Sequence, residues 1–180
     1  MPKIKTLVPF FILIALLCNA RVTAQTCDDV KIPSSLAEYV DHTYSTWRLV
    51  NTNDLEEYHR QTWRIEHPKL CPGLARGNFG PYGKFHFALL LIPKAQSDQR
   101  AIVVLLIQYK SGFRSRKLDE IKIAKPVPVL FAGPAGKYRS YDSSKKIVSP
   151  YDVVSLVFYE SSATVFYWAK TGYKSLQVTD

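Results

Sequence analysis

Two apolar stretches in the middle of the chain decide the fold: FHFALLLI at residues 85–92 and AIVVLLIQY at residues 101–109. In both stretches apolar side chains occupy consecutive positions instead of every second one. A strand that is apolar at every position buries both of its faces, so we predict that these two strands lie at the centre of a sheet. The pair Ser111-Gly112 then predicts a tight turn into a third strand over residues 113–118.

Downstream of this centre the sequence predicts further short strands. Residues 127–131 are held between prolines, which places them at a sheet edge, because proline cannot donate a hydrogen bond to a neighbouring strand. Residues 145–148 form another candidate strand. The chain then closes with an expected meander over residues 153–160, 164–169 and 173–178.

Upstream of the apolar centre the sequence predicts helices. Ser35 and Glu38 have the spacing of a capping box, and apolar residues follow at helical intervals, so we expect a helix over residues 36–44. A short extended segment is expected at residues 47–50, and a second, weaker helix over residues 54–62.

The order of these elements defines the expected fold class. We predict an α+β fold in which one or two short N-terminal helices precede a mainly antiparallel β-sheet of six to eight strands, with the helices on one side of the sheet. Strands and helices do not alternate along the chain, which argues against a nucleotide-binding Rossmann unit.

The first 24 residues have the pattern of a secretory signal peptide. Lys3 and Lys5 precede an apolar run at residues 7–17, and small residues follow, which predicts cleavage between Ala24 and Gln25. We therefore expect an exported protein, periplasmic or extracellular, with a single α+β domain over residues 25–180. An uncleaved membrane anchor and a lipid attached at Cys18 are the alternatives.

Composition narrows the class of protein. The chain has 180 residues and is 47% hydrophobic, which excludes a disordered chain, and its three cysteines are too few for a disulfide-dense scaffold. Removal of the signal peptide leaves Cys27 and Cys71. In an oxidising compartment this pair favours one disulfide, and two separate buried thiols are the alternative.

The segment at residues 76–90, RGNFGPYGKFHFALL, resembles the FG-GAP type of calcium-binding loop. The residues that match its frame are Phe79, Gly83, Lys84, Phe87 and Ala88. The resemblance implies a loop that leads directly into a strand. The positions at which that family carries aspartates hold Asn78, Gly80, Tyr82 and His86. Because calcium prefers carboxylate oxygens, a calcium-stabilised repeat is disfavoured, and we expect neither a metal nor a cofactor.

The chain also resembles a group of small bacterial exported proteins to which no activity is assigned. The resemblance rests on CPGLA at residues 71–75, FALLL at residues 87–91, PAGKY at residues 134–138 and a closing hairpin at residues 168–180. It covers most of the chain after the signal peptide. It implies an exported protein and no particular reaction.

The sequence offers no convincing catalytic set. Neither a G-x-S-x-G motif nor an H-E-x-x-H motif is present, so we assign no catalytic residue. The alternative is a small cell-envelope hydrolase whose residues come from scattered loops, with Glu57, His59 and His67 as candidates.

Charge is the more informative pattern. The chain carries 24 Lys and Arg against 15 Asp and Glu, and ten of these basic residues against three acids fall in residues 110–146. Such a stretch attracts an anionic partner, which for an exported protein means an acidic protein, an anionic glycan or a lipid surface. The expected export argues against nucleic acid despite the basic character of the chain. The alternative is a solvated face whose lysines protect sheet edges from aggregation.

Tyrosines accompany the basic residues, and tyrosine and arginine dominate binding hot spots. We expect residues 133–141, GPAGKYRSY, to form an exposed loop with such residues at its tip, although aromatic residues also pack well in strands. The sequence thus predicts a non-catalytic binding domain, inhibitor-like or immunity-like. The predicted binding residues are Arg114, Arg116, Lys117, Lys137, Tyr138, Arg139 and Tyr141.

Overall fold

The computed structural model describes Cys27, Val30 and residues 32–83, 85–95, 99–123, 126–141, 144–159 and 162–178. The predicted signal peptide and its cleavage site lie outside the described residues, as does Lys84 of the FG-GAP-like frame. Within the described part the protein has two α-helices and is mostly antiparallel sheet, so the predicted α+β class is confirmed.

The first sheet contains the two apolar stretches. Its strands are β1 (Trp47–Leu49), β2 (Leu74–Gly77), β3 (His86–Pro93), β4 (Arg100–Tyr109) and β5 (Gly112–Lys122). All neighbouring strands are antiparallel. β1 and β2 pair with successive parts of β3 along the same edge, and β5 forms the opposite edge beyond β4.

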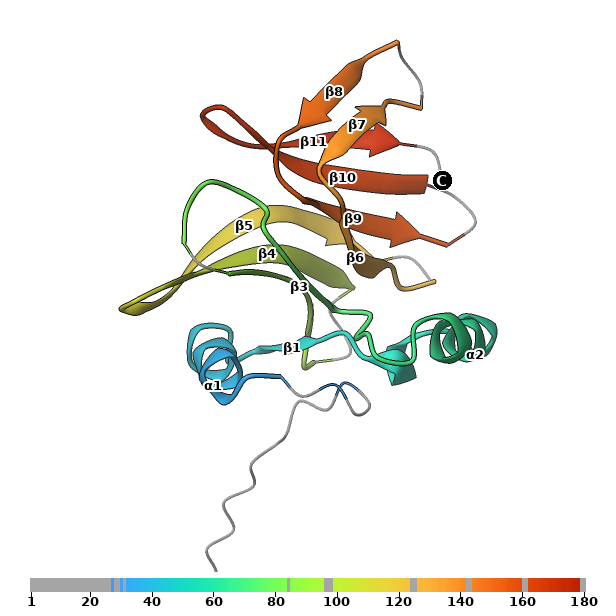
Figure 1. Cartoon of the computed structure of the whole chain (residues 1–180). Helices are drawn as coiled ribbons and strands as arrows, with labels where there is room; N and C mark the ends of the chain where they lie inside the picture. The colour runs from blue at the N-terminus through green and yellow to red at the C-terminus, as the bar shows by residue number, and fades with distance from the viewer. Residues whose placement is uncertain are drawn as a thin grey trace, which may run out of the picture.

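The second sheet packs on the first (Figure 1). It is antiparallel and contains β6 (Val129–Gly133), β9 (Val153–Phe158), β10 (Ser162–Ala169) and β11 (Gly172–Val178), in the order β11-β10-β9-β6. The expectation that the proline-flanked strand lies at a sheet edge is therefore confirmed, since β6 pairs only with β9 among the described strands.

A separate hairpin pairs β7 (Gly136–Arg139) with β8 (Lys146–Ser149). It packs Tyr138 and Ile147 against the second sheet. β7 corrects the prediction of a loop at residues 133–141. Glycine and proline in the first half of this segment are typical of a loop. Its alternating exposed and half-buried side chains nevertheless let Gly136–Arg139 pair and pack as a strand.

The predicted burial of the two central strands is confirmed. Leu90 and Val103 point toward the second sheet, whereas Leu89 and Val104 point toward helix α1 (Ser34–Thr43), and all four are fully buried. The described part of the molecule is thus layered as α1, first sheet, second sheet and the β7–β8 hairpin (Figure 1).

The strand count and the helix positions differ from the predictions. The described residues form eleven strands in three sheets instead of six to eight in one. The sequence did not reveal the short strands β2 and β7, and it predicted β1 only as a short extended segment. The helices do not share one side of a sheet. α1 covers the first sheet, whereas α2 (Glu57–Glu66) packs Trp63 against Val129 and Phe131 of the second.

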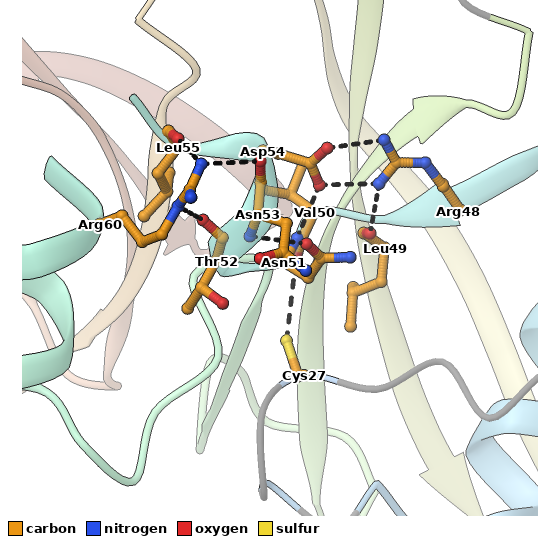
Figure 2. A network of polar contacts seen from close by, with 10 residues as sticks. All are labelled: Cys27, Arg48, Leu49, Val50, Asn51, Thr52, Asn53, Asp54, Leu55 and Arg60. Carbon is orange, nitrogen blue, oxygen red and sulfur yellow. Dashed lines mark hydrogen bonds and ion pairs between the residues drawn. The ribbon is translucent and has the colours of Figure 1, made fainter. Parts of the chain in front are cut away.

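Both predicted helix starts are corrected. α1 follows Pro33 without a side-chain cap, so Ser35 and Glu38 do not form a capping box. The capping box of the described residues lies at Asn51 and Asp54, on the 3-10 helix η1 (Thr52–Asp54). Asp54 also accepts two hydrogen bonds from the guanidinium group of Arg48, at 2.7 and 2.6 Å (Figure 2). This polar network shifts the second helix three residues beyond its predicted start.

A disulfide joins Cys27 to Cys71, as predicted, with 5.3 Å between their Cα atoms. It lies where β1 and β2 meet beside β3. There the Val50 N–H donates to the Leu90 carbonyl, and the Leu90 N–H donates to the carbonyl of Gly73. We name this place, where the end of β1 and the start of β2 meet beside Leu90 of β3, the seam between β1 and β2. A Cβ atom at Gly73 would lie 2.4 Å from the Val50 carbonyl oxygen, so only glycine fits there.

Candidate binding surface

The basic residues of β5 divide between the two faces of the first sheet. Arg114 is paired with Ile107 and Arg116 with Leu105, both of which face the second sheet. Residues directly opposite each other in an antiparallel pair share a face, so both arginines lie on that side. Lys117 is paired with Val104 and therefore lies on the side of α1.

Lys117 is also engaged with an acid. Its ammonium group lies 2.8 Å from a carboxylate oxygen of Glu120, which also binds Arg100 at 3.1 Å. The hydrogen bond from Lys117 is the main reason why the pKa of Glu120 is lowered. Lys117 therefore points to the opposite face of the sheet from the two arginines, and unlike them it forms an ion pair.

The two arginines stack on tyrosine rings instead. The guanidinium carbon of Arg116 lies 5.5 Å from the centre of the Tyr173 ring, and that of Arg114 lies 5.1 Å from the centre of the Tyr109 ring. Both tyrosines are half-buried against the core between the sheets. Within the described residues neither arginine forms an ion pair, and both are exposed.

Further aromatic residues extend this surface. Trp168 and Tyr173 are directly opposite on β10 and β11, and their ring centres lie 5.1 Å apart at an interplanar angle of 75°. Tyr82, which is 52% exposed, meets the Trp168 ring edge-on at 5.4 Å. We name this surface the arginine–aromatic cluster. It contains Tyr82, Tyr109, Arg114, Arg116, Trp168 and Tyr173.

The hydroxyl group of Tyr173 is buried without a hydrogen-bond partner among the described residues. Burial raises the pKa of Tyr173 to about 12, and the nearby positive charge of Arg116 only partly opposes this shift. A Cβ atom at Gly80 would lie 2.5 Å from this hydroxyl oxygen. The loop that precedes β3 therefore approaches the ring closely only because residue 80 is glycine.

His86 holds the same loop in place. The Phe79 N–H donates to Nδ1 of His86 at 2.8 Å, and Nε2 of His86 donates to the carbonyl of Tyr82. This arrangement requires a neutral ring, and burial lowers the pKa of His86. At the start of the loop, the Asn78 N–H donates to the Asp152 carboxylate at 2.8 Å. These contacts position Tyr82 beside Trp168.

The other predicted binding residues lie elsewhere. Lys137 and Arg139 are exposed on β7, which covers the second sheet on the side away from β5. Tyr138 lies between them in sequence but points inward, and its hydroxyl donates to the Pro134 carbonyl at 2.5 Å. Tyr141 follows β7 and is 71% exposed. The seven predicted residues therefore do not form one continuous face.

The three candidate residues of the hydrolase alternative, Glu57, His59 and His67, each contact other side chains. Glu57 accepts hydrogen bonds from Arg60 and Gln61 on its own helix. His59 stacks on Tyr159, with ring centres 4.1 Å apart. The ring of His67 packs against Trp63 and Phe131. Among the described residues, no three His, Cys, Asp or Glu side chains are grouped so that they could hold a metal ion.

Sequence reasoning did not assign Tyr82, Tyr109, Trp168 or Tyr173 to the site. The only local signal was the Ser111-Gly112 turn, which places Tyr109 and Arg114 near the same end of a hairpin. Nothing in the sequence brings the loop of Tyr82 to the β10–β11 hairpin.

Comparison with protein families, with curated proteins and with solved structures finds no match. Within the described residues, every helix is too short or too polar to cross a membrane.

Proposed function

We propose that the protein is an exported, non-catalytic binding domain that recognises an anionic partner through the arginine–aromatic cluster. One observation carries the proposal. Arg114 and Arg116 are both exposed, stack on tyrosine rings and have no carboxylate partner within the described residues.

Stacking leaves an arginine ready to bind. A guanidinium group that lies over a ring uses its flat face, so its in-plane N–H groups remain available to a carboxylate, sulfate or phosphate. Arg48 shows the alternative within the same chain, because its N–H groups are occupied by the two oxygens of Asp54. The ring contacts also restrict the motion of Arg114 and Arg116, which lowers the entropy lost on binding.

The composition of the cluster favours a protein as the anionic partner. Arginine, tyrosine and tryptophan are the residues enriched among interface hot spots, and the cluster consists of these three types. Tyr82 is half-exposed and Trp168 is partly exposed, so both offer contact area next to the arginines. An acidic surface on an exported enzyme, of the kind an inhibitor recognises, fits this arrangement.

The test compares two double variants that remove the same charge. The first is Arg114→Gln with Arg116→Gln in the cluster, and the matched control is Lys137→Gln with Arg139→Gln on β7. Binding to immobilised poly-L-glutamate is measured as the salt concentration rises from about 0.05 to 0.5 M, a range over which surface electrostatics are increasingly screened.

The cluster variant is expected to lose at least about tenfold in affinity, because two charge-assisted hydrogen bonds are removed, and the control to lose little. Equal losses in the two variants would mean that net charge alone drives binding, and would contradict the proposal. Heparin and vesicles of phosphatidylglycerol serve as further probes. Tighter binding to either, with the same dependence on the arginines, would assign the cluster to a glycan or a lipid surface instead of a protein.

A further inference from the structure

A pocket of about 380 Å³ lies at the opposite edge of the first sheet from the arginine–aromatic cluster. It is formed where the free edge of β2 approaches the free edge of β6, so both sheets contribute to it. The Leu130 N–H donates to the Pro72 carbonyl at 2.7 Å and ties the two sheets together beside the pocket. Its volume lies toward the lower end of the range of small-molecule sites, about 300–1,000 Å³.

The walls of this pocket are largely apolar. They include Leu70, Leu74, Phe87 and Phe131. Leu70 is 51% exposed, and Leu74 and Phe131 are only partly buried. Two of these walls are fixed from behind by Trp63. Its indole N–H donates to the Leu70 carbonyl at 3.0 Å, and its ring lies 5.1 Å from the ring of Phe131.

Two cations complete the pocket. Lys69 and Arg76 both line it, both are exposed, and neither forms an ion pair within the described residues. The guanidinium carbon of Arg76 lies 4.5 Å from the centre of the Phe85 ring and 5.9 Å from that of Phe87. These ring contacts restrict the guanidinium group, which forms no ion pair with any described residue. None of the described lining residues is acidic.

We propose that this pocket binds a small amphipathic anion, with its carboxylate at Arg76 and Lys69 and its hydrocarbon chain against Leu70, Leu74 and Phe131. The apolar walls favour a hydrocarbon chain, because binding removes the apolar surface of both the walls and the chain from water. The two unpaired cations favour a carboxylate, because a guanidinium group binds it through two parallel hydrogen bonds. A ligand without the hydrocarbon chain leaves the apolar walls uncovered, and a ligand without the carboxylate leaves the two cations unpaired.

This site is independent of the proposed function, since the pocket and the arginine–aromatic cluster share no residue. The probe is octanoate, and two matched probes each lack one feature. Octylammonium has the same chain with the opposite charge, and acetate has the carboxylate without the chain. Binding is followed by NMR at the Trp63 indole N–H, which lies directly behind the pocket wall.

Octanoate is expected to shift the Trp63 resonance saturably, with a Kd on the order of 0.1 to 1 mM for a ligand of this size. Arg76→Gln with Lys69→Gln should weaken binding at least about tenfold, because the charge-assisted hydrogen bonds are lost. Arg139→Gln, at an exposed arginine of β7, is the control for loss of positive charge away from the pocket and should leave the affinity unchanged.

A blocking variant tests the position of the site without removing charge. Ala132 lines the pocket and is exposed, so Ala132→Trp adds a side chain across the opening without disturbing the core. It should abolish the octanoate shift. The proposal is overturned if octylammonium or acetate binds as tightly as octanoate, if the Ala132→Trp variant binds octanoate normally, or if the Arg76 and Lys69 variant binds no more weakly than the Arg139 control.

Discussion

The guanidinium group of Arg116 on β5 stacks on the ring of Tyr173 on β11, so a charge from the first sheet is positioned by an aromatic residue of the second. The ring is itself held in place, with Trp168 against one edge and the glycine at position 80 beside its hydroxyl. The direction of the Arg116 side chain therefore depends on how the two sheets pack together. This dependence explains why the surface cannot be read from either strand alone.

The stacking predicts different effects for two substitutions of Tyr173. Tyr173→Phe keeps the ring and removes a buried hydroxyl that has no partner among the described residues, so polyglutamate affinity should be unchanged. Its free energy of unfolding should be equal or up to about 1 kcal/mol higher. Tyr173→Leu removes the surface on which Arg116 rests and should weaken polyglutamate binding severalfold. Affinity and urea unfolding are measured for both variants, and equal affinities would show that the ring does not position Arg116.

The corrected capping box gives a second prediction. Asp54→Ala removes the cap of η1 and both hydrogen bonds from Arg48, and should lower the free energy of unfolding by about 1 to 3 kcal/mol. Glu38→Ala is the control, because Glu38 is an exposed acid that the sequence pattern alone would name as a cap. That change should stay within about 0.5 kcal/mol. Urea unfolding measures both, and a larger loss for Glu38→Ala would contradict the assignment.

The disulfide should be a major source of stability. It closes a loop between residues 44 positions apart, and the loop-closure entropy removed from the unfolded chain is worth about 4 kcal/mol. The variant Cys27→Ser with Cys71→Ser should therefore unfold at a much lower urea concentration. Reduction of the original protein should have the same effect and should leave the variant unchanged. If the variant is as stable as the original protein, the bond does not constrain the seam between β1 and β2.

His86 should make stability depend on pH. Burial lowers the pKa of His86 in the folded state below its ordinary value of about 6.5, so the unfolded chain takes up the proton first as the pH falls. The contribution of neutral His86 is then complete above about pH 6.5 and is lost as the pH drops toward the lowered folded-state pKa. Protonation also removes the acceptor of the Phe79 N–H.

Urea unfolding at pH 7.5 and pH 5 measures this effect. The difference in unfolding free energy between the two pH values should shrink in His86→Gln. It should persist in His42→Gln, because His42 is exposed. An undiminished difference in the His86 variant would contradict the role assigned to this histidine.

The central strands could be predicted because their signal is local. Residues 86–92 and 101–107 are apolar at almost every position, and this pattern is consistent only with burial on both faces. The prediction of the helix caps was wrong, because neighbouring residues decide whether a local cap pattern is used. Ser35 lies inside α1 since the helix already begins after Pro33, and Asp54 caps η1 because Arg48 holds it from β1.

The candidate surface could be predicted only in part. The alternation of side chains along β5 correctly places Arg114 and Arg116 on one face, but the same alternation sends Lys117 to the other. Tyr82 and Trp168 meet only after two sheets have packed, through contacts between residues 86 positions apart in the chain. No local pattern contains that information. For the same reason, the distance of Lys137 and Arg139 from the arginines became visible only in the structure.

The most direct test of the central claim uses the three tryptophans, which lie in different parts of the molecule. Trp168 belongs to the arginine–aromatic cluster, Trp63 lies behind the pocket and Trp47 is on β1. In an NMR titration with hexaglutamate at about 0.05 M salt, where charge interactions are weakly screened, only the Trp168 indole N–H should shift. Arg114→Gln with Arg116→Gln should remove that shift. A shift at Trp63 or Trp47 with Trp168 unmoved would contradict the assignment of the cluster as the anion-binding surface.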